Sequence, residues 1–164
     1  MSLEIERKFL LQQLPAALIE EEKVKVLSEH YIEQTYLAMD DSQELRVRRI
    51  VDQASGEVTY THTFKLGNGL SREEIEYSIT ESIYEQLVNA FGFVPLTKRR
   101  ITAEWEAHII EIDTYDQIEL SVLEVEFESE AAANTFVAPT WFGKDISTER
   151  QYSNKKVWRE LQTK

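Results

Sequence analysis

Pairs of like-charged residues recur at alternate positions along this sequence, and most segments carry only one sign. The pairs are Glu74/Glu76, Glu111/Asp113 and Glu124/Glu126 for carboxylates, and Arg46/Arg48 and Lys98/Arg100 for cations. Side chains two residues apart share one face of a β-strand, where neighbouring like charges are unfavourable unless an opposite charge lies between them. Converging carboxylates suit a hard divalent cation such as Mg²⁺ or Mn²⁺, and such a site takes up phosphate oxygens as well. The candidate chemistry is therefore that of a metal and a polyanion.

The N-terminal segment E-I-E-R-K-F repeats this spacing with both signs on one face, at Glu4, Glu6 and Lys8. A solvated edge strand is one interpretation, because the charged face of an antiparallel strand commonly meets water. A lined cavity is the other. Acidic residues are depleted in strands, yet several segments carry them in pairs, and the signs are sorted by segment. Both features favour the cavity.

The elements that would position these residues are mostly strands. Apolar and polar residues alternate strictly in seven segments, and an eighth strand is expected at about 30–38, so the sequence predicts eight strands in a largely antiparallel meander. Helical spacing predicts a helix over 81–91, and shorter or less regular helices over 15–22, 130–136 and 151–161. Closing the strands with their charged faces inward and apolar faces against the helices would produce a barrel with a polar lumen. The fold class is α+β, an eight-stranded antiparallel β-barrel with flanking helices.

Composition limits the partners. The chain has 164 residues, no cysteine and a formal net charge of −12, so we expect one domain over 1–164 in the reducing cytoplasm, without disulfides or thiolate metal sites. The sequence shows no signal pattern and no apolar run long enough to cross a membrane. An acidic surface repels nucleic acids and anionic lipids, so neither is expected as a partner. An anionic ligand would need a locally basic site or a divalent cation. The oligomeric state stays open, a homodimer included.

The segments also match, in order, the motifs of a known family. After E-I-E-R-K-F come I-E-Q-T-Y-L (32–37), E-L-R-V-R-R (44–49), T-F-K (63–65), G-L-S-R-E-E-I-E (69–76), K-R-R-I (98–101), E-I-D (111–113), L-E-V-E-F (123–127) and W-F-G-K-D-I-S…R-Q-Y-S-N (141–154). The chain thus resembles, over nearly its whole length, the small bacterial members of the CYTH superfamily, the triphosphate tunnel metalloenzymes. The resemblance implies an eight-stranded antiparallel tunnel that binds a triphosphate-containing small molecule with one or two Mg²⁺ or Mn²⁺ ions.

The resemblance also assigns roles to residues. The implied metal ligands are Glu4, Glu6, Glu124 and Glu126, with Asp113 as a further one. The implied phosphate-binding and catalytic cations are Lys8, Arg46, Arg48, Lys65 and Arg100, with Lys98 as an addition and Arg72 as a further binding residue. Glu74, Glu76 and Glu111 would support the basic residues or metal-bound water, and Lys144 or Arg150 would close one mouth of the tunnel. Glu73 and Ser147 depart mildly from the family pattern, where a basic residue and threonine are common.

The resemblance implies a metal-dependent hydrolase that converts a triphosphate, most simply inorganic tripolyphosphate, to diphosphate and phosphate. A class IV adenylyl cyclase, a thiamine triphosphatase and a non-catalytic polyphosphate- or nucleotide-binding module are the alternatives. The cyclase would need a base-binding pocket and the thiamine enzyme an aromatic platform, and the sequence identifies neither. Binding alone would need only the cations.

His62 alternates with Thr61 and Thr63, which places it on the outer face.

Overall fold

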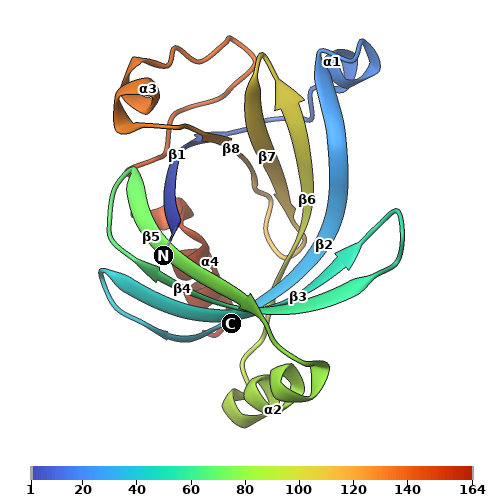
Figure 1. Cartoon of the computed structure of the whole chain (residues 1–164), viewed down its shortest axis with the longest axis vertical. Coiled ribbons are helices and arrows are strands. Elements are labelled where there is room, and N and C mark those ends of the chain that lie inside the picture. Colours follow the sequence, from blue (N-terminus) through green and yellow to red (C-terminus); the bar gives the residue numbers. More distant parts are fainter. Residues whose placement is uncertain (1, 164) are drawn as a thin grey trace.

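In a computed structural model that describes residues 2–163, eight antiparallel strands close into one barrel (Figure 1). The strands are β1 (Ser2–Leu10), β2 (Val24–Met39), β3 (Gln43–Asp52), β4 (Val58–Leu66), β5 (Ser71–Ser78), β6 (Leu96–Trp105), β7 (His108–Tyr115) and β8 (Ser121–Glu126). Their order around the barrel is β1-β5-β4-β3-β2-β6-β7-β8. The predicted eight-stranded antiparallel barrel is confirmed.

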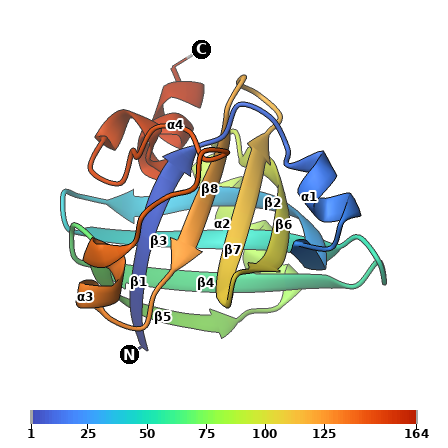
Figure 2. The same cartoon turned by 90° about the horizontal axis from the view of Figure 1, so that it is seen from above.

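The strand order departs from a simple meander at two places. β2 to β5 form one meander and β6 to β8 another, but β1 lies between β5 and β8, and β2 pairs with both β3 and β6. Figure 2 shows β1, β8, β7 and β6 crossing above β2 to β5. β2 spans 16 residues and has register shifts between Val26 and Ser28 and between Tyr36 and Ala38. Such irregularities bend a strand, which lets β2 belong to both crossing layers.

Four helices flank the barrel within residues 2–163: α1 (Ala16–Glu20), α2 (Glu81–Phe91), α3 (Glu130–Thr135) and α4 (Asn154–Leu161). The predicted helix over 81–91 has the predicted bounds, with Thr80 accepting from the Ile83 N–H and Gly92 ending it in the left-handed region at φ 63°. The C-terminal helix begins at 154 rather than 151, because Ser153 caps it and a 3₁₀ turn occupies 150–152. No helix in the described part of the chain is long and apolar enough to cross a membrane.

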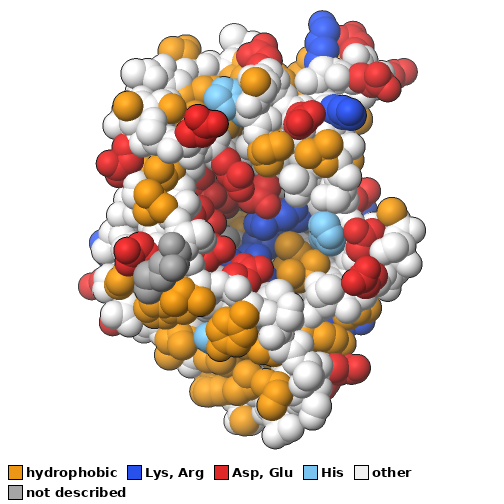
Figure 3. Space-filling view, viewed as in Figure 1, with side chains coloured by type: hydrophobic (Ala, Val, Ile, Leu, Met, Phe, Trp, Pro, Cys, Tyr) orange, Lys and Arg blue, Asp and Glu red, His pale blue; other side chains and the backbone are white. Residues whose placement is uncertain are grey.

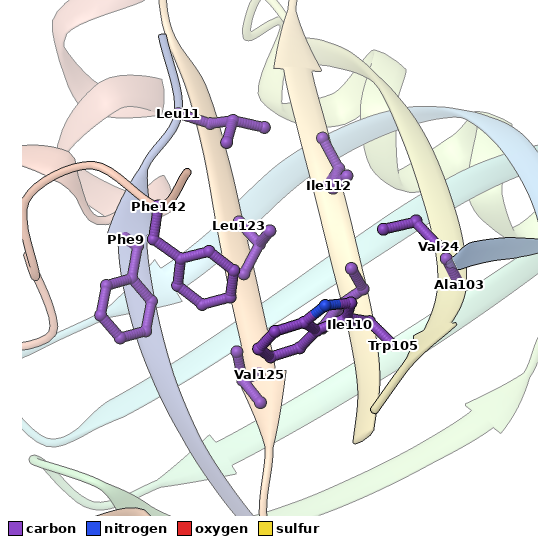
Figure 4. Packing of buried hydrophobic residues seen from close by; sticks show 10 residues of the cluster. All are labelled: Phe9, Leu11, Val24, Ala103, Trp105, Ile110, Ile112, Leu123, Val125 and Phe142. Carbon is purple, nitrogen blue, oxygen red and sulfur yellow. The ribbon is translucent and has the colours of Figure 1, made fainter. Parts of the chain in front are cut away.

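The hydrophobic core lies mainly outside the barrel wall. Its larger cluster consists of Phe9, Leu11, Val24, Ala103, Trp105, Ile110, Ile112, Leu123, Val125 and Phe142 (Figure 4). Most of these side chains come from the outer faces of β1, β6, β7 and β8, which are covered by α1 and the chain from α3 onward. The second cluster joins Val157, Trp158 and Leu161 of α4 to the barrel end nearest that helix. Most apolar residues thus pack outward, and the inner face carries mainly polar groups.

The segment that follows α3 is fastened to β1 by backbone hydrogen bonds. The N–H groups of Gly143 and Ile146 donate to the carbonyls of Leu10 and Lys8, both at 2.8 Å. The Arg7 guanidinium, on the outer face, pairs with Asp145 at 2.6 Å. These contacts hold the residues between α3 and α4 across one end of the barrel.

Replacing Gly143 by alanine should destabilise the protein. A Cβ there would lie 2.4 Å from the Leu10 carbonyl oxygen, a backbone atom that cannot turn aside. We expect Gly143→Ala to lower the free energy of unfolding by about 1–3 kcal/mol, as overpacking does. Urea unfolding would measure it, with the exposed Asn134→Ala in α3 as control. Equal stability of the two variants would contradict the close approach.

Candidate metal and phosphate site inside the barrel

The barrel encloses a cavity of about 580 Å³ whose wall is mainly polar (Figure 3). All eight strands and the segment before α4 contribute side chains to it. Most of the predicted site residues line it: Glu4, Glu6, Lys8, Arg46, Arg48, Lys65, Arg72, Glu74, Glu76, Arg100, Glu111, Glu124 and Glu126. Figure 3 looks into the opening, where red acidic side chains gather on one side and blue basic ones lie deeper. The alternating charges therefore form the lining of a cavity rather than a solvated outer face.

Carboxylates from three adjacent strands converge in the cavity. Glu6, Glu111 and Glu124 each offer an oxygen, and these oxygens lie within 4.8 Å of one another. Pairing brings them together, because Glu124 stands opposite Glu111 on one side and Lys8 on the other. Glu126 lies next along β8, opposite Glu6. An all-oxygen donor set fits a hard divalent cation such as Mg²⁺ or Mn²⁺.

The pKa values of the clustered carboxyls indicate that the cluster lacks sufficient positive charge to neutralise it. Burial, followed by the charges of Glu124 and Glu4, raises the pKa of Glu6 well above its ordinary value. Burial also raises the pKa of Glu111, with Arg100 opposing and Glu124 adding to the rise. The pKa of Glu124 falls to about 2 because the Lys8 charge and a hydrogen bond from Glu6 outweigh burial. Like carboxylates this close cannot all ionise without a counter-charge, and a divalent cation supplies one.

Basic side chains form the facing wall, and several are held in place by carboxylates. The Lys65 ammonium lies 2.9 Å from Glu4 and 3.4 Å from Glu74. Arg72 pairs with Glu44 at 2.6 Å, and Arg46 lies 3.8 Å from the same carboxylate. Glu44 was not among the predicted site residues. The sequence could have indicated it, because Glu44 alternates with Arg46 and Arg48 in E-L-R-V-R and therefore shares their face of the strand.

Arg48 differs from these cations. Its Nε donates to the Gln34 Oε1 at 3.0 Å, and no carboxylate of residues 2–163 lies within 4 Å of it. Burial, followed by the charges of Arg46 and Arg100, lowers the pKa of Arg48 to about 10. A buried guanidinium that faces a cavity between other cations is costly unless an anion binds there. Arg48 therefore marks the part of the wall most suited to an oxyanion.

Two predicted site residues lie behind the cavity wall. Asp113 is buried and accepts from Arg100 at 2.8 and 2.9 Å, while the Lys98 ammonium lies 2.8 Å from it. Despite burial, these two cations hold the pKa of Asp113 well below its ordinary value. Neither Lys98 nor Asp113 lines the cavity, and Asp113 does not share the oxygen cluster of Glu6, Glu111 and Glu124. Its contacts are those of a residue that positions Arg100.

The C-terminal segment lines the cavity with residues other than the two predicted there. Lys144 is exposed and pairs with Glu149 at 2.8 Å, and Arg150 lines a neighbouring pocket instead. Ile146, Ser147, Glu149, Ser153, Asn154 and Lys155 line the cavity from this segment. The Lys8 ammonium donates to the Tyr152 carbonyl at 2.8 Å, so this segment also orients a cation of the inner wall. Of the histidines, His62 packs outward on Tyr77 as predicted, whereas His30 lines the cavity.

A closed antiparallel barrel whose cavity sets a carboxylate cluster against buried Lys and Arg side chains is the tunnel architecture that the sequence motifs predicted. Comparison with known proteins agrees: residues 2–157 match the model of the CYTH domain. The chain therefore belongs to the CYTH domain family. It is 34% identical to the inorganic triphosphatase of Nitrosomonas europaea, covering 93% of this chain and 94% of the relative.

Solved structures agree on the fold. The crystal structure of the inorganic triphosphatase NE1496 is 30% identical with a TM-score of 0.65, over 96% of this chain and 95% of that one. A protein from Pyrococcus furiosus is similar in fold alone, with 20% identity and a TM-score of 0.61 over 80% of this chain and 84% of its own.

The role of Asp113 can be tested by Asp113→Asn. Removing one partner of a buried ion pair leaves charge uncompensated, so we expect the free energy of unfolding to fall by about 3–5 kcal/mol. The shift in melting temperature on adding Mg²⁺ should nevertheless persist, because Asp113 lies outside the oxygen cluster. Urea unfolding and thermal melts would measure both, with the exposed Asp116→Asn as control. Loss of the Mg²⁺ shift at undiminished stability would make Asp113 a metal ligand instead.

The acidic cluster makes a second prediction. Mg²⁺ should raise the melting temperature of the wild type, because it binds the folded cluster and not the unfolded chain. Glu6→Gln should raise the melting temperature of the metal-free protein by about 2–4 °C, the effect of removing about 1 kcal/mol of repulsion. The same change should abolish most of the Mg²⁺ shift. Melts in EDTA and in Mg²⁺ would test this beside the exposed Glu85→Gln, and an unchanged Mg²⁺ shift in Glu6→Gln would exclude Glu6 as a ligand.

Proposed function

We propose that this protein is a divalent-metal-dependent hydrolase that converts a triphosphate, inorganic tripolyphosphate above all, to diphosphate and phosphate. The observation that carries the proposal is the inner wall, where an oxygen cluster of Glu6, Glu111 and Glu124 shares one cavity with Arg48, a buried cation that contacts no described carboxylate. The 34% identity to an inorganic triphosphatase over nearly the whole chain supports it.

The metal would be held by Glu6, Glu111 and Glu124, with Glu4 and Glu126 beside them. A bound Mg²⁺ or Mn²⁺ neutralises phosphate oxygens and lowers the pKa of water. The carboxylates of the chain would fix the position of the bound cation, because they lie on adjacent paired strands rather than on loops. In this set Glu111 takes the role of further metal ligand that the resemblance assigned to Asp113.

The cations of the wall would bind the phosphate chain and stabilise the charge that develops on it. Arg46, Arg48 and Arg100 present guanidinium groups that match phosphate oxygens, and Lys8 and Lys65 add point charges. Donors already oriented before substrate arrives are the main source of stabilisation in phosphoryl transfer. Asp113 and Glu74 hold Arg100 and Lys65 in those orientations. The reaction needs no covalent nucleophile from the chain.

The uncharged part of the wall favours an inorganic substrate. Ile32, Ile50 and Thr59 line the cavity where β2, β3 and β4 lie side by side. Among the described lining residues, Tyr36 and His30 are the aromatic ones, and Tyr36 is 1% exposed and packed against Trp158. A nucleobase or thiamine ring therefore finds little surface on which to stack. A cyclase or a thiamine triphosphatase would need such a surface.

The proposal is tested by phosphate release from tripolyphosphate, ATP and thiamine triphosphate with Mg²⁺ or Mn²⁺. We expect tripolyphosphate to be preferred and Glu4→Gln/Glu6→Gln to lose more than about 100-fold in kcat/KM, since disturbing partners of metal ligands alone costs 10–100-fold. Glu57→Gln/Glu85→Gln, two exposed carboxylates, is the matched control. Diphosphate and cyclic AMP from ATP would indicate the cyclase. Polyphosphate binding without turnover would indicate a binding module.

A further inference from the structure

A second pocket, of about 490 Å³, adjoins the cavity on the side of α4. We call it the basic vestibule, because Arg72, Arg150, Lys155, Lys156 and Arg159 line it. It is continuous with the cavity, since Gly69, Arg72, Ser147, Ser153 and Lys155 line both. The vestibule is thus an approach to the inner wall from outside.

Arg72 of the vestibule pairs with Glu44 at 2.6 Å, but the other four cations are largely free of carboxylates. Within the described residues, Arg150 and Arg159 have no carboxylate within 4 Å, and Lys156 has only Glu160, at 3.8 Å. Lys155 donates to the backbone carbonyl of Asp40 at 3.2 Å. These side chains therefore leave most of their charge facing the pocket.

Two carboxylates, Asp40 and Asp41, also line the vestibule and oppose an anion. The Asp40 Oδ1 accepts from the backbone N–H groups of Ser42 and Gln43, which lower the pKa of this carboxyl and occupy one of its two oxygens. Arg72 is paired with Glu44, so four cations against two carboxylates leave this pocket positive on a chain whose formal net charge is −12.

The opening seen in Figure 3 has the opposite character. Acidic side chains gather on its rim, and α4 lies behind the barrel in that view. Glu76 and Glu126 line the cavity and are exposed, whereas the deeper Glu124 is buried. A polyanion that approaches this opening meets like charge first.

We infer that the basic vestibule is the entrance through which a linear phosphate chain reaches the inner wall. The inference rests on the proposed function and adds the route by which the substrate arrives. At physiological salt the field of an exposed charge fades within about 8 Å, so charges at an entrance act on an approaching ligand while distant ones do not. A local patch of opposite sign raises the rate of association even when the whole molecule repels the ligand.

The test reverses two vestibule charges that lie outside the cavity lining, in Lys156→Glu/Arg159→Glu. The matched control is Lys25→Glu/Arg99→Glu, which changes the net charge equally at exposed positions outside both pockets. At low salt we expect kcat/KM for tripolyphosphate to fall about 5- to 10-fold in the vestibule variant and less than about twofold in the control. The difference should vanish at high salt, and kcat should stay unchanged.

Calorimetry of tripolyphosphate binding in Mg²⁺ separates this inference from the proposed function. If the wild type binds but does not hydrolyse, the proposed function fails, and weaker binding by the vestibule variant than by the control at low salt still supports the entrance. The entrance is overturned if the vestibule variant and the control have equal kcat/KM values at low salt or, where the wild type does not hydrolyse, equal affinities for tripolyphosphate. Absence of tripolyphosphate binding by the wild type overturns both.

Discussion

The charged interior is the constraint on which the rest of this structure depends. Small closed barrels are usually filled by apolar side chains, whereas here the inner face carries ionised groups around a cavity of about 580 Å³. The wall therefore cannot be stabilised from within, and its apolar faces must be buried from outside. Phe9, Trp105 and Phe142 do this under the segments around α3, and Trp158 does it from α4. The helices and the C-terminal segment thus bury the apolar outer face of the barrel.

Burying so many charges is tolerated because they hold one another in small groups across neighbouring strands. Asp113 binds Arg100 and Lys98, while Glu4 and Glu74 flank Lys65. Breaking such a group costs far more than the group contributes to stability, so buried ion pairs are better explained by positioning than by stability. Cations fixed in this way need no rearrangement when a phosphate chain binds beside them. The same contacts that permit burial also prepare the site.

The period-two pattern predicts which residues face inward, but not which of them meet. Glu111 and Asp113 occupy the same face of β7 and are equivalent in the sequence. Register separates them, because Glu111 stands opposite Glu124 while Asp113 stands opposite Arg100. Long-range pairing also places β1 between β5 and β8, which no local pattern shows. Lys144 was predicted from its motif to close a mouth, but a motif does not show that its side chain pairs with Glu149 on the surface.

Charge balance inside the cavity couples the two ligands of the proposed function. Among the described residues, nine glutamates and seven Lys and Arg side chains line it, so the wall alone carries more negative than positive charge. A phosphate chain entering the metal-free cavity would meet several cations already paired with glutamates, namely Arg46, Lys65, Arg72 and Arg100. A divalent cation at Glu6, Glu111 and Glu124 would cancel this excess of negative charge, and the phosphate chain would in turn add ligands to that cation. Because coupling of this kind is reciprocal, each ligand should raise the affinity for the other by the same factor. An acidic protein can then bind a polyanion, provided that metal and substrate are bound together.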